Sequence, residues 1–198
     1  MKYLWIAVFS GVLIWSGIGP KDYLIWVLEV FPAVIGILLI GMTWNKFRLT
    51  PLLYALILLH SIVLMVGGHY TYAEVPLFDD IKPLFGFERN NYDKVGHLMQ
   101  GITPAILTRE IIIRRQLISG PGWRKFFILA VCLAVSALYE LVEWVVALIS
   151  GASAEAFLAT QGFAWDTQTD MAFALLGAIA ALLLLSGIHD RQLQTISK

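Results

Sequence analysis

Long apolar runs alternate along the chain with short polar stretches. A helix needs about 20 apolar residues to cross the hydrocarbon core of a bilayer, so runs of this length predict transmembrane helices. Six such runs occur, over approximately residues 3–19, 24–44, 51–68, 92–113, 125–150 and 168–187. Turn-forming residues separate several of them, at Gly19-Pro20, at Pro51 and at Ser119-Gly120-Pro121-Gly122. The pattern predicts an all-α, polytopic membrane protein in which residues 1–198 form one domain, a single bundle of six transmembrane helices.

The composition supports lipid as the solvent of this protein. Apolar residues make up 59% of the chain and charged residues only 14%, against about 25% charged in an average soluble domain. Lysine plus arginine and aspartate plus glutamate are equal at 14 each, which argues against a nucleic-acid partner. The single cysteine, Cys132, excludes an intrachain disulfide and a cysteine-based metal site. We therefore expect membrane lipids to be the main partners, and the sequence does not specify an oligomeric state.

Basic residues indicate the orientation, because they concentrate in cytoplasmic segments. With six spans, ten of them fall on one side: Lys2, Lys46, Arg48, Arg109, Arg114, Arg115, Arg124, Lys125, Arg191 and Lys198. Only four fall on the other side: Lys21, Lys82, Arg89 and Lys94. This distribution predicts that both termini are cytoplasmic and that the longest loop, 69–91, is external.

Ionisable residues inside the spans cost roughly 2.5–3.5 kcal/mol each on insertion and are therefore candidate functional groups. Here they gather near the predicted outer ends of spans three to six: His69, Asp93, His97, Glu140, Glu143, Asp166 and Asp170. Spacings of three or four residues place the members of each pair on one helix face. At 1.5 Å per residue, four of the groups lie about 6–15 Å from the outer surface. The pattern predicts one polar cluster that opens outward.

The charge of this cluster predicts what it holds. Five buried carboxylates must either take up protons or bind a cation. Lys94 and Arg89 are the only bases nearby in sequence, and helical geometry predicts that Lys94 points about 100° away from Asp93. The histidines favour a divalent metal, and without thiolates the ligands suit Zn²⁺, Mn²⁺ or Fe²⁺. The surplus of groups leaves room for a second metal, a general base, or carboxylates that orient the imidazoles.

From these considerations we predict a set of roles. The metal ligands are expected to be His69, His97, Asp166 and Asp170. Glu140 or Glu143 would act as general base, while Asp93 would orient His97 or complete the metal shell. Purely structural interpretations also exist, because Asp93 and Asp166 could cap helices and His69 could lie at the headgroup level. Glu29 and His60 are more simply explained by snorkelling and by a hydrogen bond between helices, respectively.

Two stretches resemble known families. Asp93-Lys94-Val95-Gly96-His97 resembles the Asp-Lys-x-x-His motif of VanZ-like membrane proteins. Glu140, Gly177 and the stretch Asp166-Thr167-Gln168-Thr169-Asp170 also resemble that family, except that Asp170 replaces its usual asparagine. The chain as a whole is similar to the YjdF-type family of bacterial inner-membrane proteins, through Gly67-Gly68-His69-Tyr70-Thr71-Tyr72, Asn91-Tyr92-Asp93-Lys94 and Tyr139-Glu140-Leu141-Val142-Glu143-Trp144. This resemblance implies a bacterial inner-membrane location and no particular reaction.

Three functions remain open. The one we favour is a metal-dependent hydrolase or transferase that acts on a lipid or lipid-linked envelope substrate. The second is a non-catalytic envelope protein that binds a lipid or an antibiotic. The third is a proton- or cation-coupled transporter, against which stand the missing inverted repeat and an expected lack of acids in the inner halves of spans four to six.

Overall fold

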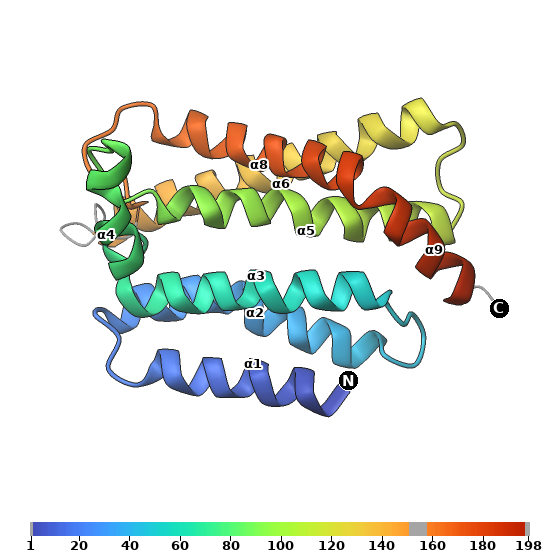
Figure 1. Cartoon of the computed structure of the whole chain (residues 1–198), viewed down its shortest axis with the longest axis horizontal. Coiled ribbons are helices and arrows are strands. Elements are labelled where there is room, and N and C mark those ends of the chain that lie inside the picture. Colours follow the sequence, from blue (N-terminus) through green and yellow to red (C-terminus); the bar gives the residue numbers. More distant parts are fainter. Residues whose placement is uncertain (1, 151–157, 197–198) are drawn as a thin grey trace.

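The computed structural model describes residues 2–150 and 158–196, which are helical throughout apart from their connections. The helices are α1 (Lys2–Gly17), α2 (Tyr23–Thr43), α3 (Pro51–Tyr70), the 3-10 turn η1 (Tyr72–Glu74), α4 (Pro76–Phe85), α5 (Tyr92–Arg114), α6 (Pro121–Ser150), α8 (Asp166–Leu184) and α9 (Ser186–Ile196). The longest of them lie side by side and alternate in direction (Figure 1). The described part of the chain is therefore an all-α bundle, as the apolar pattern predicts.

The two ends of the bundle differ (Figure 1). Both chain ends, α9 and the connections 44–50 and 115–120 lie at one end, here called the terminal end. The connection between α1 and α2, the helix α4 and the start of α8 lie at the other, here called the α4 end. Because α4 crosses the direction of the long helices, it covers part of the α4 end.

Four helices in the described part of the chain are long and apolar enough to cross a membrane: Tyr23–Thr43, Pro51–Tyr70, Pro121–Ile149 and Asp166–Leu184. They coincide with four of the six predicted runs. The other two runs are also helical, but α1 is shorter, at 16 residues, and α5 carries several charged residues. The chain is thus a polytopic helical membrane protein.

The charged helix α5 is sheltered by its neighbours, since it packs against α3, α6 and α8. Its contact with α8 is extensive and depends on two glycines. A Cβ atom on Gly101 would overlap the Ala174 carbonyl group, and one on Gly177 would overlap the Leu98 carbonyl oxygen. The two backbones can therefore approach closely only because both positions lack a side chain.

Two segments are more ordered than the apolar pattern predicts. The predicted loop 69–91 contains η1 and α4; Pro76 begins α4, and Gly86, at φ 67°, ends it in the left-handed conformation. Asn90 fastens α4 to the start of α5, because its side-chain amide donates to Val75 O and to Asp79 Oδ1, each at 3.0 Å. Beyond α8, the chain bends and continues as α9, which the sequence interpretation did not anticipate.

Candidate functional site

The first turns of α5 carry two of the predicted site residues. Asp93 and His97 are buried and lie one turn apart, with 3.3 Å between Asp93 Oδ1 and His97 Nε2. The start of the helix is fixed locally, because Asn90 Oδ1 accepts a hydrogen bond of 3.1 Å from the Tyr92 backbone N–H. The predicted pairing of Asp93 with His97 is thus present.

Gln100 orients the imidazole of His97. The Gln100 side-chain oxygen lies 3.1 Å from His97 Nδ1, where it can accept a hydrogen bond from this ring nitrogen. Nε2 then faces three carboxylates, from Asp93 at 3.3 Å and from Glu140 and Asp170 at 3.8 Å each. A histidine whose second nitrogen is held in this way has the arrangement typical of a metal ligand.

Helix α8 brings its two aspartates to the same place. Asp170 is buried, and one ligand atom from each of Asp93, His97 and Asp170 lies within 4.8 Å of the others. In the described part of the chain, this is the group that could hold a metal ion. The mixed oxygen and nitrogen donors suit the divalent ions that the sequence predicts.

The expected orientation of Lys94 is wrong. Its Nζ lies 2.9 Å from Asp166 and 3.4 Å from Asp93 and also contacts Asp170. Neighbouring side chains leave a helix about 100° apart. The four-carbon stem of lysine is long and flexible enough to bring the ammonium group back to Asp93. Arg89 adds a second cation, 2.6 Å from Asp166. The aspartates are therefore partly neutralised by two bases to which the sequence analysis gave no role.

Helix α6 supplies two glutamates with a different environment. Glu140 is 9% exposed, and its Oε1 accepts no hydrogen bond from the described residues. Glu143 is 8% exposed, and neither a hydrogen bond nor an ion pair joins it to another described residue. Both carboxylates thus lie in the site with unused hydrogen-bonding capacity, as general bases or cation ligands do.

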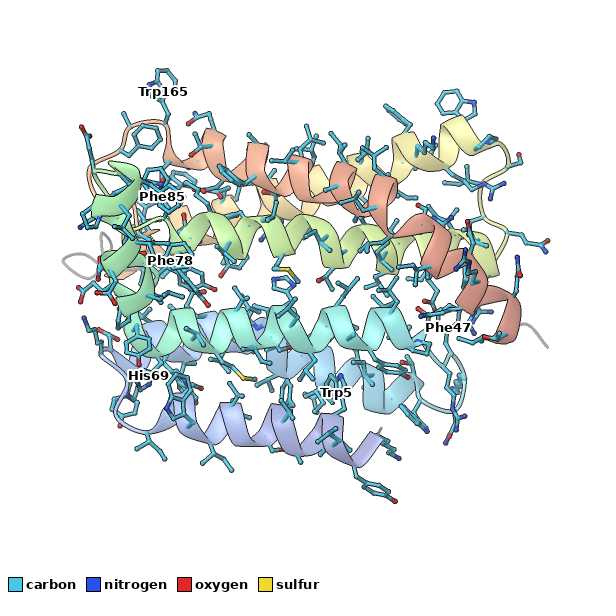
Figure 2. All side chains as sticks on the ribbon, viewed as in Figure 1. Trp5, Phe47, His69, Phe78, Phe85 and Trp165 are labelled. Carbon is cyan, nitrogen blue, oxygen red and sulfur yellow. The ribbon has the colours of Figure 1, made fainter. Side chains whose placement is uncertain are left out.

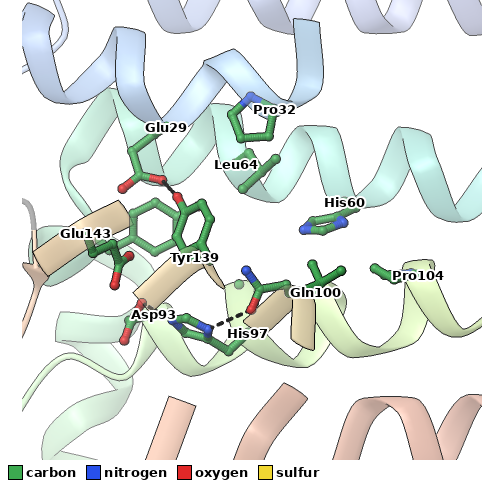
Figure 3. A pocket seen from close by; sticks show the side chains of 13 residues that line it. Glu29, Pro32, His60, Leu64, Asp93, His97, Gln100, Pro104, Tyr139 and Glu143 are labelled. Carbon is green, nitrogen blue, oxygen red and sulfur yellow. Dashed lines mark hydrogen bonds and ion pairs between the residues drawn. The ribbon is translucent and has the colours of Figure 1, made fainter. Parts of the chain in front are cut away.

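A cavity of about 150 Å³ lies beside these groups, between α2, α3, α5 and α6. Figure 3 shows acidic side chains at one end of it and His60 at the other. Glu29, which the sequence explained as a snorkelling residue, is buried and accepts a hydrogen bond of 3.1 Å from Tyr139 OH. Tyr139 and Gln100 line the cavity too, and the sequence analysis gave neither a role, because polar side chains without charge give a weak signal in an apolar helix.

The structure does not bring His69 to this site. Its Nδ1 lies 3.0 Å from the Ser16 carbonyl oxygen, and its ring packs against Trp15 with 4.7 Å between centroids. Figure 2 shows it at the α4 end of α3, beside α1 rather than α5. Asp166 lies closer to the site, but its carboxylate forms ion pairs with Lys94 and Arg89. The group that could hold a metal ion therefore contains neither of these two predicted ligands.

A second buried polar group lies at the terminal end of α5, where the sequence analysis expected no acid. Glu110 is fully buried and accepts hydrogen bonds from Thr50 N, Thr50 Oγ1, His189 and Arg114, at 2.7 to 3.1 Å. Arg109 completes the group by donating to His189 Nδ1 at 2.9 Å and to Asp190 at 2.7 Å. We call these six residues the Glu110 cluster. The expectation that the inner halves of the spans lack acids is therefore wrong.

Comparison with known proteins shows the class to which this protein belongs. The chain resembles multi-pass helical proteins of the bacterial inner membrane, and it is 48% identical over 183 residues to the inner membrane protein YjdF of Escherichia coli (strain K12), which covers 92% of this chain and 88% of the relative. The family described as "Predicted membrane protein (DUF2238)" matches residues 1–191. The chain belongs to this family, which confirms the resemblance seen in the sequence and makes it a multi-pass inner-membrane protein. No solved structure matches it.

Proposed function

We propose that this protein is a metal-dependent hydrolase or transferase that acts on a lipid or lipid-linked substrate of the cell envelope. The observation that carries the proposal is the buried group of Asp93, His97 and Asp170, whose ligand atoms lie within 4.8 Å of one another. The unpartnered Oε1 of Glu140, 3.8 Å from His97 Nε2, adds a candidate base beside it. Compared with the ligand set expected from the sequence, the proposal keeps His97 and Asp170 and adds Asp93.

The balance of charge favours a bound cation. Six buried carboxylates surround the site, whereas two basic side chains pair with them. The carboxylates are those of Glu29, Asp93, Glu140, Glu143, Asp166 and Asp170. Because an uncompensated carboxylate is costly in a low-dielectric interior, the excess favours a divalent cation or bound protons.

Lys94 is the internal competitor of such a cation. It contacts Asp93 through Oδ2, while Oδ1 of the same carboxylate faces His97. A carboxylate has two oxygens, so Asp93 can hold a metal on one side and the ammonium group on the other. Asp170 is different, because Oδ1 faces both Lys94 and His97. Metal binding would therefore require Lys94 to withdraw from Asp170.

In the proposed reaction, a divalent cation would polarise a carbonyl or phosphoryl oxygen and activate water. Glu140 takes the proton from the attacking group, and Gln100 orients the imidazole of His97. Arg89 and Lys94 would hold Asp166 in place at the start of α8.

The proposal also takes all six long helices as membrane crossings, with both termini cytoplasmic. The excess of basic residues at the terminal end supports this orientation. The site at the α4 end would then lie near the outer headgroups, within reach of ester or phosphate bonds.

Metal analysis tests the proposal. Protein purified in detergent without chelator, and again after incubation with Zn²⁺, Mn²⁺ or Fe²⁺, should hold about one equivalent of metal. His97→Ala and Asp170→Asn should lose it, whereas the matched control His69→Ala should keep it. Lys94→Met should bind at least as tightly as the unmodified chain, since it removes the competing cation. A metal-free protein under all these conditions would contradict the proposal and leave protonated carboxylates, hence proton-linked transport or binding.

A further inference from the structure

The acids of the site divide into two groups with different neighbours. The aspartates of α5 and α8 lie within ion-pair distance of Lys94, and one of them also pairs with Arg89. The glutamates come from α2 and α6, and none of them lies within ion-pair distance of a lysine or arginine among the described residues. They are Glu29, Glu140 and Glu143. The aspartates are thus paired with basic side chains, whereas in the described part of the chain the glutamates are not.

The cavity lies mainly on the side of the glutamates. Its wall carries the carboxyl groups of Glu29, Asp93 and Glu143, and no lysine or arginine lines it. Glu143 is the informative member of this group. It is only 8% exposed, and Figure 3 shows it facing the cavity. No hydrogen bond joins it to another described residue. A buried acceptor without a partner indicates a group that arrives from outside the chain.

The remaining wall fits the same kind of group. Tyr72 and Tyr139 also line the cavity and add aromatic surface beside the carboxylates. Glu29 accepts hydrogen bonds from Tyr139 and Tyr72, and a carboxylate with two such bonds still has acceptor capacity. Among the described residues, three carboxylates and no lysine or arginine line the cavity, so its charge favours a cation over an anion.

We propose that the cavity binds the ammonium group of an amine-bearing substrate, held between Glu29 and Glu143. The inference rests on the proposed function in that it treats the cavity as the substrate-binding part of the same site. The ammonium group could belong to a lipid headgroup or to a small free amine, since the chemistry that recognises it is the same. In either case the bond to be attacked would extend from the cavity toward His97 and Glu140.

Calorimetric titration of the protein in detergent tests this inference. The probes are ethanolamine, a short-chain phosphatidylethanolamine and a phosphatidylglycerol of the same chain length. We expect saturable binding of the phosphatidylethanolamine and not of the phosphatidylglycerol. Glu29→Gln and Glu143→Gln should each weaken it about tenfold or more, because each removes a charge-assisted hydrogen bond while keeping the side-chain shape. The control is Glu88→Gln, which removes an exposed carboxylate before α5 and should leave binding unchanged.

The outcomes separate the sources and the two proposals. Binding of both ethanolamine and the amine lipid supports a free amine as sufficient ligand, whereas binding of the lipid alone supports a headgroup. Equal binding of the phosphatidylglycerol, or unchanged affinity in both glutamine variants, would overturn the inference. Metal content is measured on the same samples. Amine binding by a protein without metal would contradict only the proposed function. Bound metal without amine binding would contradict only this inference.

Discussion

The two ends of α5 carry buried polar clusters of similar composition and opposite character. At the terminal end, Glu110 is enclosed by donors from four groups, and His189 is hydrogen-bonded through both ring nitrogens. Near the α4 end, on α6, the buried Glu140 has one oxygen, Oε1, without a hydrogen-bond partner among the described residues, and the buried Glu143 lines a cavity. Complete pairing is what a structural network needs, and incomplete pairing is what a ligand site needs.

The Glu110 cluster also has an evident structural task. It ties α5 to the start of α3 through Thr50, which caps that helix, and to α9 through His189. Gln192 of α9 adds a hydrogen bond of 2.8 Å to the Leu52 backbone N–H. The cluster thus fastens three segments at the terminal end.

The comparison predicts its largest effect at Glu110. Glu110→Ala should lower the free energy of unfolding by about 3–5 kcal/mol, because it leaves His189, Arg114 and Thr50 without their buried acceptor. SDS titration of the purified protein in mixed micelles measures this change. A loss below about 1 kcal/mol would mean that the cluster is not the structural network described here.

An intermediate effect is expected at the contact between α5 and α8. Gly101→Ala should cost about 1–3 kcal/mol, because its Cβ meets the backbone of α8 rather than a flexible side chain. It should also lower metal content, since it moves Asp170 away from His97. Gly36→Ala is the matched control, because no atom lies within 4 Å of its added Cβ. Equal stability of the two variants would refute the close approach of α5 and α8.

The smallest effect, and one of opposite sign, is expected at Glu140. Glu140→Gln should leave the free energy of unfolding unchanged or raise it by up to about 1 kcal/mol, because it removes one charge from an acidic site and adds an N–H donor. The same SDS titration measures it beside Glu110→Ala. A destabilisation as large as that of Glu110→Ala would show that the two clusters do not differ in kind.

Much of this arrangement follows from the sequence. Apolar runs predicted the helices, and the spacing of Asp93 with His97 and of Asp166 with Asp170 predicted faces that the structure brings together. That convergence is predictable because helical periodicity fixes the direction of short side chains. It does not fix long ones, and for this reason the position of the Lys94 ammonium group was missed.

Other features depend on tertiary contacts that no local pattern contains. Glu110 was overlooked because it stands between arginines, where a charged residue is expected at the end of a span. Its burial results from α9, a helix that forms after the bend at the end of α8. Likewise, His69 lies near the α4 end as predicted, but its direction is set by Ser16 and Trp15 of α1.

Pro104, inside α5, lies between these two clusters. A proline has no backbone N–H, so the carbonyl of Gln100 loses its helical hydrogen bond and α5 is most easily bent at this point. His97 and Glu110 are about 20 Å apart along the helix axis, one before and one after Pro104. If a ligand in the cavity displaces Asp93 and His97, we therefore expect α5 to bend at Pro104, while the half of the helix that carries Glu110 stays in place.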